Sequence, residues 1–183
     1  MTRMLASSRV LRTGNPLTLE GIRQACPAVF AERPAPGVSE RYQYVPTIEP
    51  LKALLNNGWG VYEASQQRSR KSDRDPYTKH MLRLRRLTDF NVQNFSTAEG
   101  VPELIVVNAH DRTAYYKLFG GFFRFVCSNG AIVGNHIASF SVKHLVGPST
   151  SEEVLTAAQR VVTESFPAML ADIDKFQSVI LIS

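Results

Sequence analysis

Apolar residues recur at helical spacing in two segments near the start of the chain. Between residues 18 and 31 they repeat every three or four positions, and Pro27 is expected to shorten or kink this helix. Thr18 is suited to cap its first turn. A second helix is expected to begin near Thr47 and to stop at Asn57-Gly58, which tolerate a left-handed backbone.

Alternating apolar and polar residues predict strands in the middle of the chain. In the strand from Trp59 to Gln67 we expect Trp59 and Val61 to face one side of the sheet. Tyr62 and Ala64 are expected to face the other side.

A second predicted strand runs from Lys79 to Leu87. Its alternation places Leu82 and Leu84 on one face, and Lys79, Arg83 and Arg85 on the other. The polar, turn-rich segment 68–77 between the two strands predicts a hairpin loop.

The later strands are less uniform in pattern. The unbroken apolar run Leu104–Asn108 predicts a central strand, and alternation predicts another strand over 139–145. Residues 115–127 match a helix by the spacing of their apolar residues, yet they are also aromatic enough for a strand. We favour a strand with a bend, because Gly120-Gly121 disfavours a helix and Asn129-Gly130 is a hairpin-turn sequence.

The last predicted element is a long helix. Ser149 with Glu152 has the spacing of a capping box, and an apolar stripe continues past Pro167 to Ile173. The chain then ends within the apolar run 179–183, from which we expect a truncated chain that lacks a partner element for this strand.

These elements predict an α+β fold, in which a mostly antiparallel sheet of β-hairpins packs against the long C-terminal helix. Prolines and glycine in 32–40 predict a linker. We therefore predict an N-terminal helical arm and linker over 1–40 and an α+β core over 41–183.

Composition narrows the class of protein. A chain of 183 residues with 44% hydrophobic residues has the composition of one globular domain. Only Cys26 and Cys127 are present, which disfavours a disulfide scaffold or a zinc site and suits a reducing compartment. No apolar run is long enough to cross a bilayer, so we expect a cytoplasmic protein without a membrane partner.

Positive charge is concentrated in one stretch of the chain. The net charge is +5, and eight of the 21 lysines and arginines lie within 68–86. These predicted DNA-binding residues are Arg68, Arg70, Lys71, Arg74, Lys79, Arg83, Arg85 and Arg86. Guanidinium groups suit phosphate, so the stretch predicts a nucleic-acid-binding ridge. The alternative is a solvated sheet edge whose charges prevent aggregation.

Aromatic residues next to basic ones form a second candidate site. Bases of single strands stack on exposed aromatic side chains, and Tyr115, Tyr116 and Lys117 are the best candidates for such an exposed role. The phenylalanines of the same region are expected to lie in the core.

Catalytic patterns are weak. His110-Asp111 resembles the metal-binding pair of phosphohydrolases, but the other histidines do not supply matching spacing, and a turn at a strand end is the better interpretation. No cluster of acids suggests two-metal chemistry, and no phosphate-binding glycine loop is present. We expect no catalytic residues, metal or cofactor, and no enzyme activity.

The segment from Asn108 to Gly134, with Phe-Arg-Phe-Val-Cys-Ser-Asn-Gly at its centre, resembles the signature of a phage- and plasmid-borne family. That family is known only as a domain of unknown function, number nine-three-two. The resemblance spans about residues 44–176 and carries no catalytic residues. Members usually continue past the point where this chain ends.

A looser resemblance covers Ile48 to Arg86. The order of helix, Asn57-Gly58-Trp59 turn, strand, loop and a strand with alternating arginines is similar to Rad-fifty-two-type single-strand annealing proteins. In those proteins a β-β-β-α core forms rings that hold single-stranded DNA in a positive groove. Their glycine-tyrosine-glycine segment is not evident here.

The resemblance implies a single-stranded-DNA-binding and annealing protein of a phage or plasmid, which acts in homologous recombination as an oligomeric ring without ATP. A partner exonuclease or a host single-strand-binding protein would be further partners. The alternative is an anti-defence or anti-restriction protein that binds a host protein and no DNA. A nuclease with an unrecognised metal site is a third hypothesis.

Overall fold

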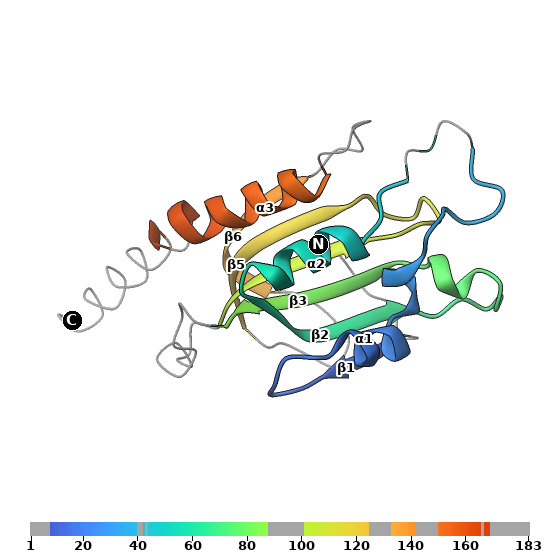
Figure 1. Cartoon of the computed structure of the whole chain (residues 1–183), viewed down its shortest axis with the longest axis horizontal. Helices are drawn as coiled ribbons and strands as arrows, with labels where there is room; N and C mark the ends of the chain where they lie inside the picture. Colours follow the sequence, from blue (N-terminus) through green and yellow to red (C-terminus); the bar gives the residue numbers. More distant parts are fainter. Residues whose placement is uncertain are drawn as a thin grey trace.

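A computed structural model describes residues 8–39, 42, 44–87, 101–124, 133–141, 150–165 and 167–168. Its centre is a six-stranded sheet in the order β1-β2-β3-β4-β5-β6, in which every neighbouring pair is antiparallel (Figure 1). The strands are β1 (Ser8–Arg12), β2 (Trp59–Gln67), β3 (His80–Arg86), β4 (Val101–Asn108), β5 (Lys117–Arg124) and β6 (Val133–Ser141).

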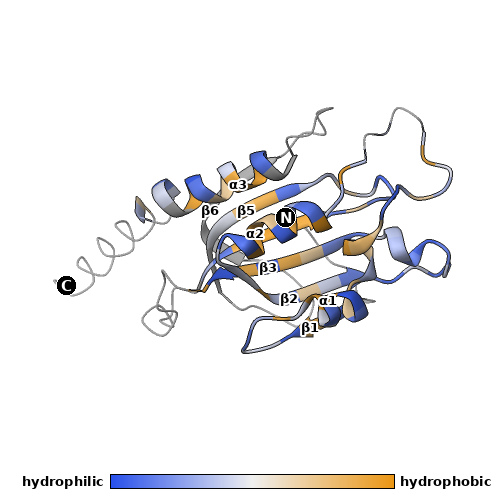
Figure 2. Ribbon diagram, in the orientation of Figure 1, coloured by the Kyte–Doolittle hydropathy of each residue, from blue (hydrophilic) through white to orange (hydrophobic). Residues whose placement is uncertain are grey.

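Six short helical elements are described in addition to this sheet. The α-helices are α1 (Leu19–Ala25), α2 (Ile48–Asn56) and α3 (Thr150–Arg160). The 3-10 helices are η1 (Pro27–Phe30) and η2 (Asp75–Tyr77), and a π-helix, η4 (Val161–Ser165), continues α3. Helices α2 and α3 lie on the same face of the sheet (Figure 1). Figure 2 shows apolar residues along the strands that these helices cover.

The main hydrophobic core lies between that face and the helices. Leu82 and Leu84 of β3 pack there with Leu51 and Leu54 of α2 and Val154 of α3. The predicted orientation of Leu82 and Leu84 is thus confirmed. A smaller apolar cluster lies on the opposite face of the sheet and contains Met81, Ile105 and Val107.

A β-bulge in β2 changes one predicted orientation. The register pairs Val61 with Leu84 and Glu63 with Arg83, so that Tyr62 is an extra residue. Beyond the bulge, Ala64 lies in the main core together with Val61, whereas alternation placed these two residues on opposite faces. The prediction for Ala64 was therefore wrong, because one inserted residue reverses the facing of those after it.

Residues 117–124 of the segment 115–127 form strand β5, which agrees with the strand that we favoured from its glycines. Gly120 lies in β5, and a Cβ added there would stand 2.4 Å from Cγ1 of Val161 in η4. The missing side chain thus allows the end of the helical layer to lie directly on the sheet.

The N-terminal segment includes a strand that the sequence pattern did not predict. β1 pairs with β2, while Ile22 of α1 and Val29 of η1 lie in the main core. The predicted cap of α1 is confirmed, since the hydroxyl of Thr18 accepts a hydrogen bond from the N–H of Gly21 at 3.1 Å. The boundary at residue 40 between an N-terminal arm and an α+β core stays a prediction.

The α+β class with an antiparallel sheet is confirmed. Within the described residues α3 ends at Arg160 and the π-helix follows it, so the long C-terminal helix stays a prediction. The turn predicted at Asn129-Gly130, the strand residues 142–145, and the helical stripe at 169–173 lie outside the described residues.

Candidate nucleic-acid interface

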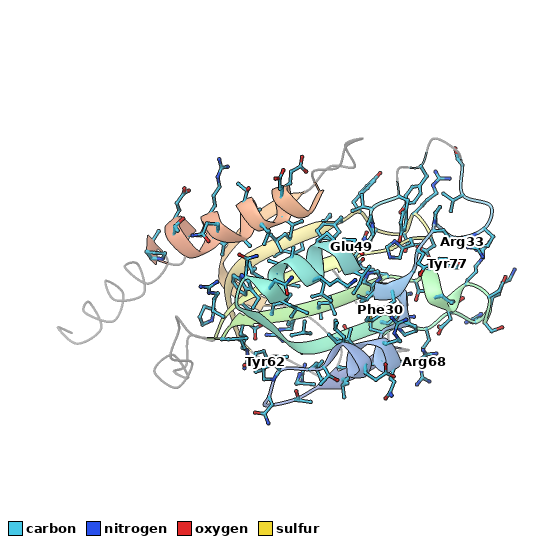
Figure 3. All side chains as sticks on the ribbon, in the orientation of Figure 1. Phe30, Arg33, Glu49, Tyr62, Arg68 and Tyr77 are labelled. Atoms are coloured by element: carbon cyan, nitrogen blue, oxygen red, sulfur yellow. The ribbon has the colours of Figure 1, made fainter. Side chains whose placement is uncertain are left out.

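The connection between β2 and β3 presents a group of basic side chains. It is the hairpin loop expected from the sequence, and its exposed basic residues are Arg68, Arg70, Lys71 and Arg74. Figure 3 places Arg68 and Tyr77 at one end of the molecule, with Tyr62 at the other end of the same strands. Four positive charges therefore project from a single connection.

Asp75 holds the backbone of this connection. One carboxylate oxygen accepts the N–H of Ser69 at 3.1 Å, and the other accepts Nη2 of Arg9 at 2.6 Å. The carbonyl of Asp75 accepts Nε2 of Gln66 at 2.7 Å. Because Asp75 is paired with Arg9 of β1, its charge is balanced outside the group of exposed basic residues.

Two lysines extend the basic surface onto the sheet. Burial, followed by the positive charge of Lys117, lowers the pKa of Lys79 from its usual value. Lys79 directly precedes β3 and Lys117 begins β5, so β4 lies between them. Neighbouring ammonium groups repel each other, and an anion bound between them would relieve that repulsion.

We define the basic end as the residues of this surface: Arg68, Arg70, Lys71, Arg74, Lys79 and Lys117.

Three of the predicted DNA-binding arginines lie outside the basic end, and two of these, Arg83 and Arg85, pair with carboxylates. Arg83 donates from Nε to Glu103 at 2.6 Å, and its Nη1 lies 3.4 Å from Glu63. Arg85 donates from Nε to the second oxygen of Glu103 at 2.8 Å and stacks over the ring of Tyr62. Arg83, Glu63 and Glu103 are all buried on the sheet face opposite the helices.

These side chains form a chain of ion pairs across four strands. It runs from Arg12 through Glu63, Arg83 and Glu103 to Arg85. We call it the charge ladder. A guanidinium that already neutralises a buried carboxylate is unsuited to bind phosphate. The prediction that Arg83 and Arg85 form part of a phosphate-binding ridge is therefore corrected.

Arg86 is separated from the basic end by the length of β3. A seven-residue strand spans roughly 20 Å. At the far end, Nη1 of Arg86 donates to the carbonyl of Asn57 at 2.7 Å, and the guanidinium lies 5.6 Å from the ring centre of Trp59. The predicted single ridge is thus divided into two separate places.

The two candidate tyrosines differ in exposure. Tyr115 is 65% exposed, in agreement with its predicted orientation. Tyr116 is fully buried in the main core, and burial raises the pKa of its hydroxyl. The prediction of an exposed Tyr116 was wrong, because this residue lies two positions before the buried Leu118 of β5 and therefore faces the same core.

A buried polar cluster lies beneath the loops at the basic end. The hydroxyl of Thr47 lies 2.8 Å from Nε2 of His80 and 3.5 Å from Nε2 of His110, and it accepts Nδ2 of Asn108 at 3.0 Å. His110 Nε2 also lies 3.0 Å from the carbonyl of Ala28. The cluster joins the start of α2 to the ends of β3 and β4, which fits a structural role.

The dipeptide His110-Asp111 forms the turn that was expected. One oxygen of Asp111 accepts both the N–H and the hydroxyl of Thr113, at 3.0 and 2.5 Å. Within the described residues no three His, Cys, Asp or Glu side chains gather as a metal site. Burial raises the pKa of the Cys26 thiol to about 12, which disfavours the reactive thiolate.

No helix in the described part of the chain has the length and apolar character needed to cross a membrane. Cys127 lies outside the described residues.

The comparisons with known proteins identify a family. A family model described as Domain of unknown function (DUF932) matches residues 36–182. The chain is 39% identical over 147 residues to UPF0380 protein YafZ and, equally, to UPF0380 protein YfjQ, both of Escherichia coli (strain K12). Each match covers 79% of this chain and 52% of the relative, so the chain spans about half the length of these relatives. No solved structure was found to match. The chain therefore belongs to the DUF932 family, as its central signature indicated.

Proposed function

We propose that this protein binds single-stranded DNA through the basic end and anneals complementary strands as an oligomer, without ATP. The observation that carries the proposal is the group of four exposed basic side chains on the connection between β2 and β3. Asp75 holds the backbone of this connection in place through its bonds to Ser69 and Arg9. The charge ladder takes no part in DNA binding in this proposal.

The physical basis is charge neutralisation. Each Lys or Arg that neutralises a phosphate releases condensed counterions, so the affinity falls as salt rises. The basic side chains lie on the connection between β2 and β3. These two paired strands hold the ends of the connection in place. A backbone contact of this kind is indifferent to sequence, as strand annealing requires.

Tyr115 supplies a second type of contact. It is 65% exposed and lies two positions before Lys117. A base stacked on an exposed aromatic ring contributes about 1–3 kcal/mol. The proposal therefore places phosphates over the basic end and one base against Tyr115.

The wider setting is part of the same proposal. The order of β4, β5, β6 and α3 along the chain is compatible with the β-β-β-α core of Rad-fifty-two-type annealing proteins. We propose a long C-terminal helix continuing from α3, a ring-shaped homo-oligomer, and a cytoplasmic role in recombination of a phage or plasmid. A partner exonuclease or a host single-strand-binding protein would complete that pathway.

The proposal is tested with an unphosphorylated, fluorescein-labelled oligothymidylate by fluorescence anisotropy over a series of salt concentrations. The Arg70→Gln/Lys71→Gln double variant should weaken binding about tenfold and flatten the salt slope by roughly 1.4, if each residue neutralises one phosphate of a single strand. Both side chains are exposed, so the fold should be unaffected.

The matched control removes two exposed positive charges elsewhere. Arg23→Gln/Lys52→Gln alters α1 and α2 and should leave the affinity and the salt slope close to those of the parent protein. Equal losses in both double variants would show that only net charge matters. Absence of DNA binding by the parent protein would overturn the proposal and favour a protein-binding, anti-defence role.

A further inference from the structure

A groove lies at the opposite end of β3 from the basic end. It has a volume of about 380 Å³, within the range of roughly 300–1,000 Å³ that small-molecule sites occupy. The turn between α2 and β2 forms one wall, and the last turns of α3 with the start of η4 form the other. Residues that line it include Asn57, Trp59, Arg86, Gln159, Arg160 and Thr163.

The chemistry of these walls favours an anion. Two guanidiniums, those of Arg86 and Arg160, line the groove, and no Asp or Glu is among the described residues that do so. The side chains of Asn57, Gln159 and Thr163 add neutral polar groups. Nδ2 of Asn57 already donates to the carbonyl of Ala53 at 2.9 Å, and the hydroxyl of Thr163 donates to the carbonyl of Gln159 at 3.0 Å. Guanidiniums suit the oxygens of phosphate, because several N–H donors lie in one plane.

Local features of the backbone shape both walls. Gly58 has a φ of 81°, which turns the chain sharply from α2 into β2 and brings Trp59 next to Arg86. On the other wall the helix widens into the π-helix η4, which contains Thr163. Such π-helical turns occur often at functional sites.

Close packing of η4 on the sheet holds the second wall in place. Val161 is fully buried against Gly120, which has no Cβ to prevent the approach. Its neighbour in sequence, Arg160, is exposed on the groove side. Arg86 meanwhile holds the first wall, through its bond to the carbonyl of Asn57.

We propose that this groove binds a phosphate monoester of nucleotide size, with Arg160 and Arg86 on the phosphate. Trp59 lies next to Arg86 and is buried at the base of the groove, where it can report on occupancy. A free mononucleotide and the phosphorylated 5′ end of a DNA strand share this chemistry. The inference does not rest on the proposed function, because it uses none of the residues of the basic end.

Trp59 provides a local signal, because it is the one tryptophan of the sequence and lines the groove. We would titrate the full chain with thymidine 5′-monophosphate and with inorganic phosphate and follow Trp59 fluorescence, using free tryptophan to correct for absorption. The monophosphate should give a saturable change, and Arg160→Ala should weaken its binding at least tenfold. Arg160→Lys should recover part of the loss.

Arg33→Ala is the matched control, since Arg33 is exposed and lies outside the groove. It should bind the monophosphate as the parent protein does. The idea is overturned if the monophosphate and phosphate both leave the fluorescence unchanged, or if Arg160→Ala binds as tightly as the parent protein.

The source of the phosphate is found by comparing a 5′-phosphorylated with a 5′-hydroxyl oligothymidylate in the Arg70→Gln/Lys71→Gln variant, which weakens contacts at the basic end. Tighter binding of the phosphorylated strand than of the mononucleotide assigns the groove to strand ends. Equal binding of the mononucleotide and the phosphorylated strand assigns it to free nucleotides. Equal Trp59 responses to the phosphorylated and hydroxyl strands would contradict phosphate recognition altogether.

Discussion

At the scale of single residues, Glu103 holds the charge ladder together. It is completely buried and accepts hydrogen bonds from Arg83 at one oxygen and from Arg85 at the other. A buried ion pair adds little net stability when both partners are present, but removal of one partner leaves an uncompensated charge. The fold therefore depends on Glu103 more than on any exposed carboxylate.

Glu103→Gln should lower the free energy of unfolding by about 3–5 kcal/mol, because two guanidiniums lose their shared carboxylate. Urea unfolding followed by circular dichroism measures the change. Glu49→Gln is the control: Glu49 lies 3.8 Å from Lys52 in an exposed pair, which should be worth less than about 1 kcal/mol. A loss in Glu103→Gln no larger than that of the control would contradict the importance of the ladder.

The sequence predicts which sheet face Arg83 of β3 occupies, but it does not predict the carboxylates that Arg83 pairs with. Alternation along β3 correctly placed Arg83 on the face opposite Leu82 and Leu84. Its partner carboxylates lie 20 residues away on either side in sequence, on β2 and β4. Only the strand register brings them together, and nothing local in the sequence specifies that register. Alternation alone therefore predicts a ligand surface at Arg83 and Arg85, which the structure shows as internal ion-pair partners.

His80 makes the stability depend on pH. Burial, followed by the effect of His110, lowers the pKa of His80 from 6.5 to about 3. The unfolded chain therefore binds a proton more readily than the folded chain does. The stability from neutral His80 is fully present above pH 6.5 and is lost as the pH falls towards 3.

From the pKa shift of His80 alone we expect the free energy of unfolding to be about 2 kcal/mol lower near pH 5 than near pH 7. One pKa unit corresponds to roughly 1.4 kcal/mol. Urea titrations at the two pH values measure the difference. His80→Gln cannot take up the proton, so its stability should change less between them. Parallel pH profiles for the variant and the parent protein would refute this assignment.

At the scale of elements, the contact of β5 with η4 fixes the helical layer on the sheet. Gly120 and Val161 meet where a Cβ has no room. The glycine pair was interpreted from the sequence as a bend that disfavours a helix, and the strand that it predicted is present. The contact of Gly120 with the helical layer could not be predicted from the sequence. Val161 lies about 40 residues further along the chain, and the π-helix that contains it has no recognisable sequence signal.

Gly120→Ala should destabilise the fold by about 1–3 kcal/mol, because the new methyl group would overlap Val161. Adding Val161→Ala should recover part of this loss, and a double-mutant cycle by urea unfolding measures the coupling. Gly14→Ala is the control, since a Cβ there has no atom within 4 Å. Additive effects of the two core substitutions would argue against a direct steric contact.

At the scale of the whole molecule, basic residues are divided between surface and interior. The exposed group lies on one connection, whereas Arg83 balances buried acids. The six positive side chains of the basic end are offset on the same connection by the exposed Asp73, so this end remains strongly positive. Among the described strands, β1 and β6 each pair with one neighbour, so the sheet has two edges through which copies of the chain could associate.

An annealing protein must bring two DNA strands together, and an oligomer does so by placing many basic ends along one strand. Modest contacts in each subunit then act together, because the second and later contacts benefit from a high effective concentration. We expect native mass spectrometry to show oligomers whose population rises when a long oligonucleotide is added. We also expect the protein to accelerate pairing of two complementary labelled strands equally with and without ATP.

The Arg70→Gln/Lys71→Gln variant should anneal strands several-fold more slowly than the parent protein, and Arg23→Gln/Lys52→Gln should not. High salt should abolish the difference between them, because it removes the gain from counterion release. The decisive comparison is between binding and annealing. If the parent protein binds single strands as a monomer and does not accelerate pairing, then the basic end serves DNA binding alone, and the annealing role fails while the interface remains.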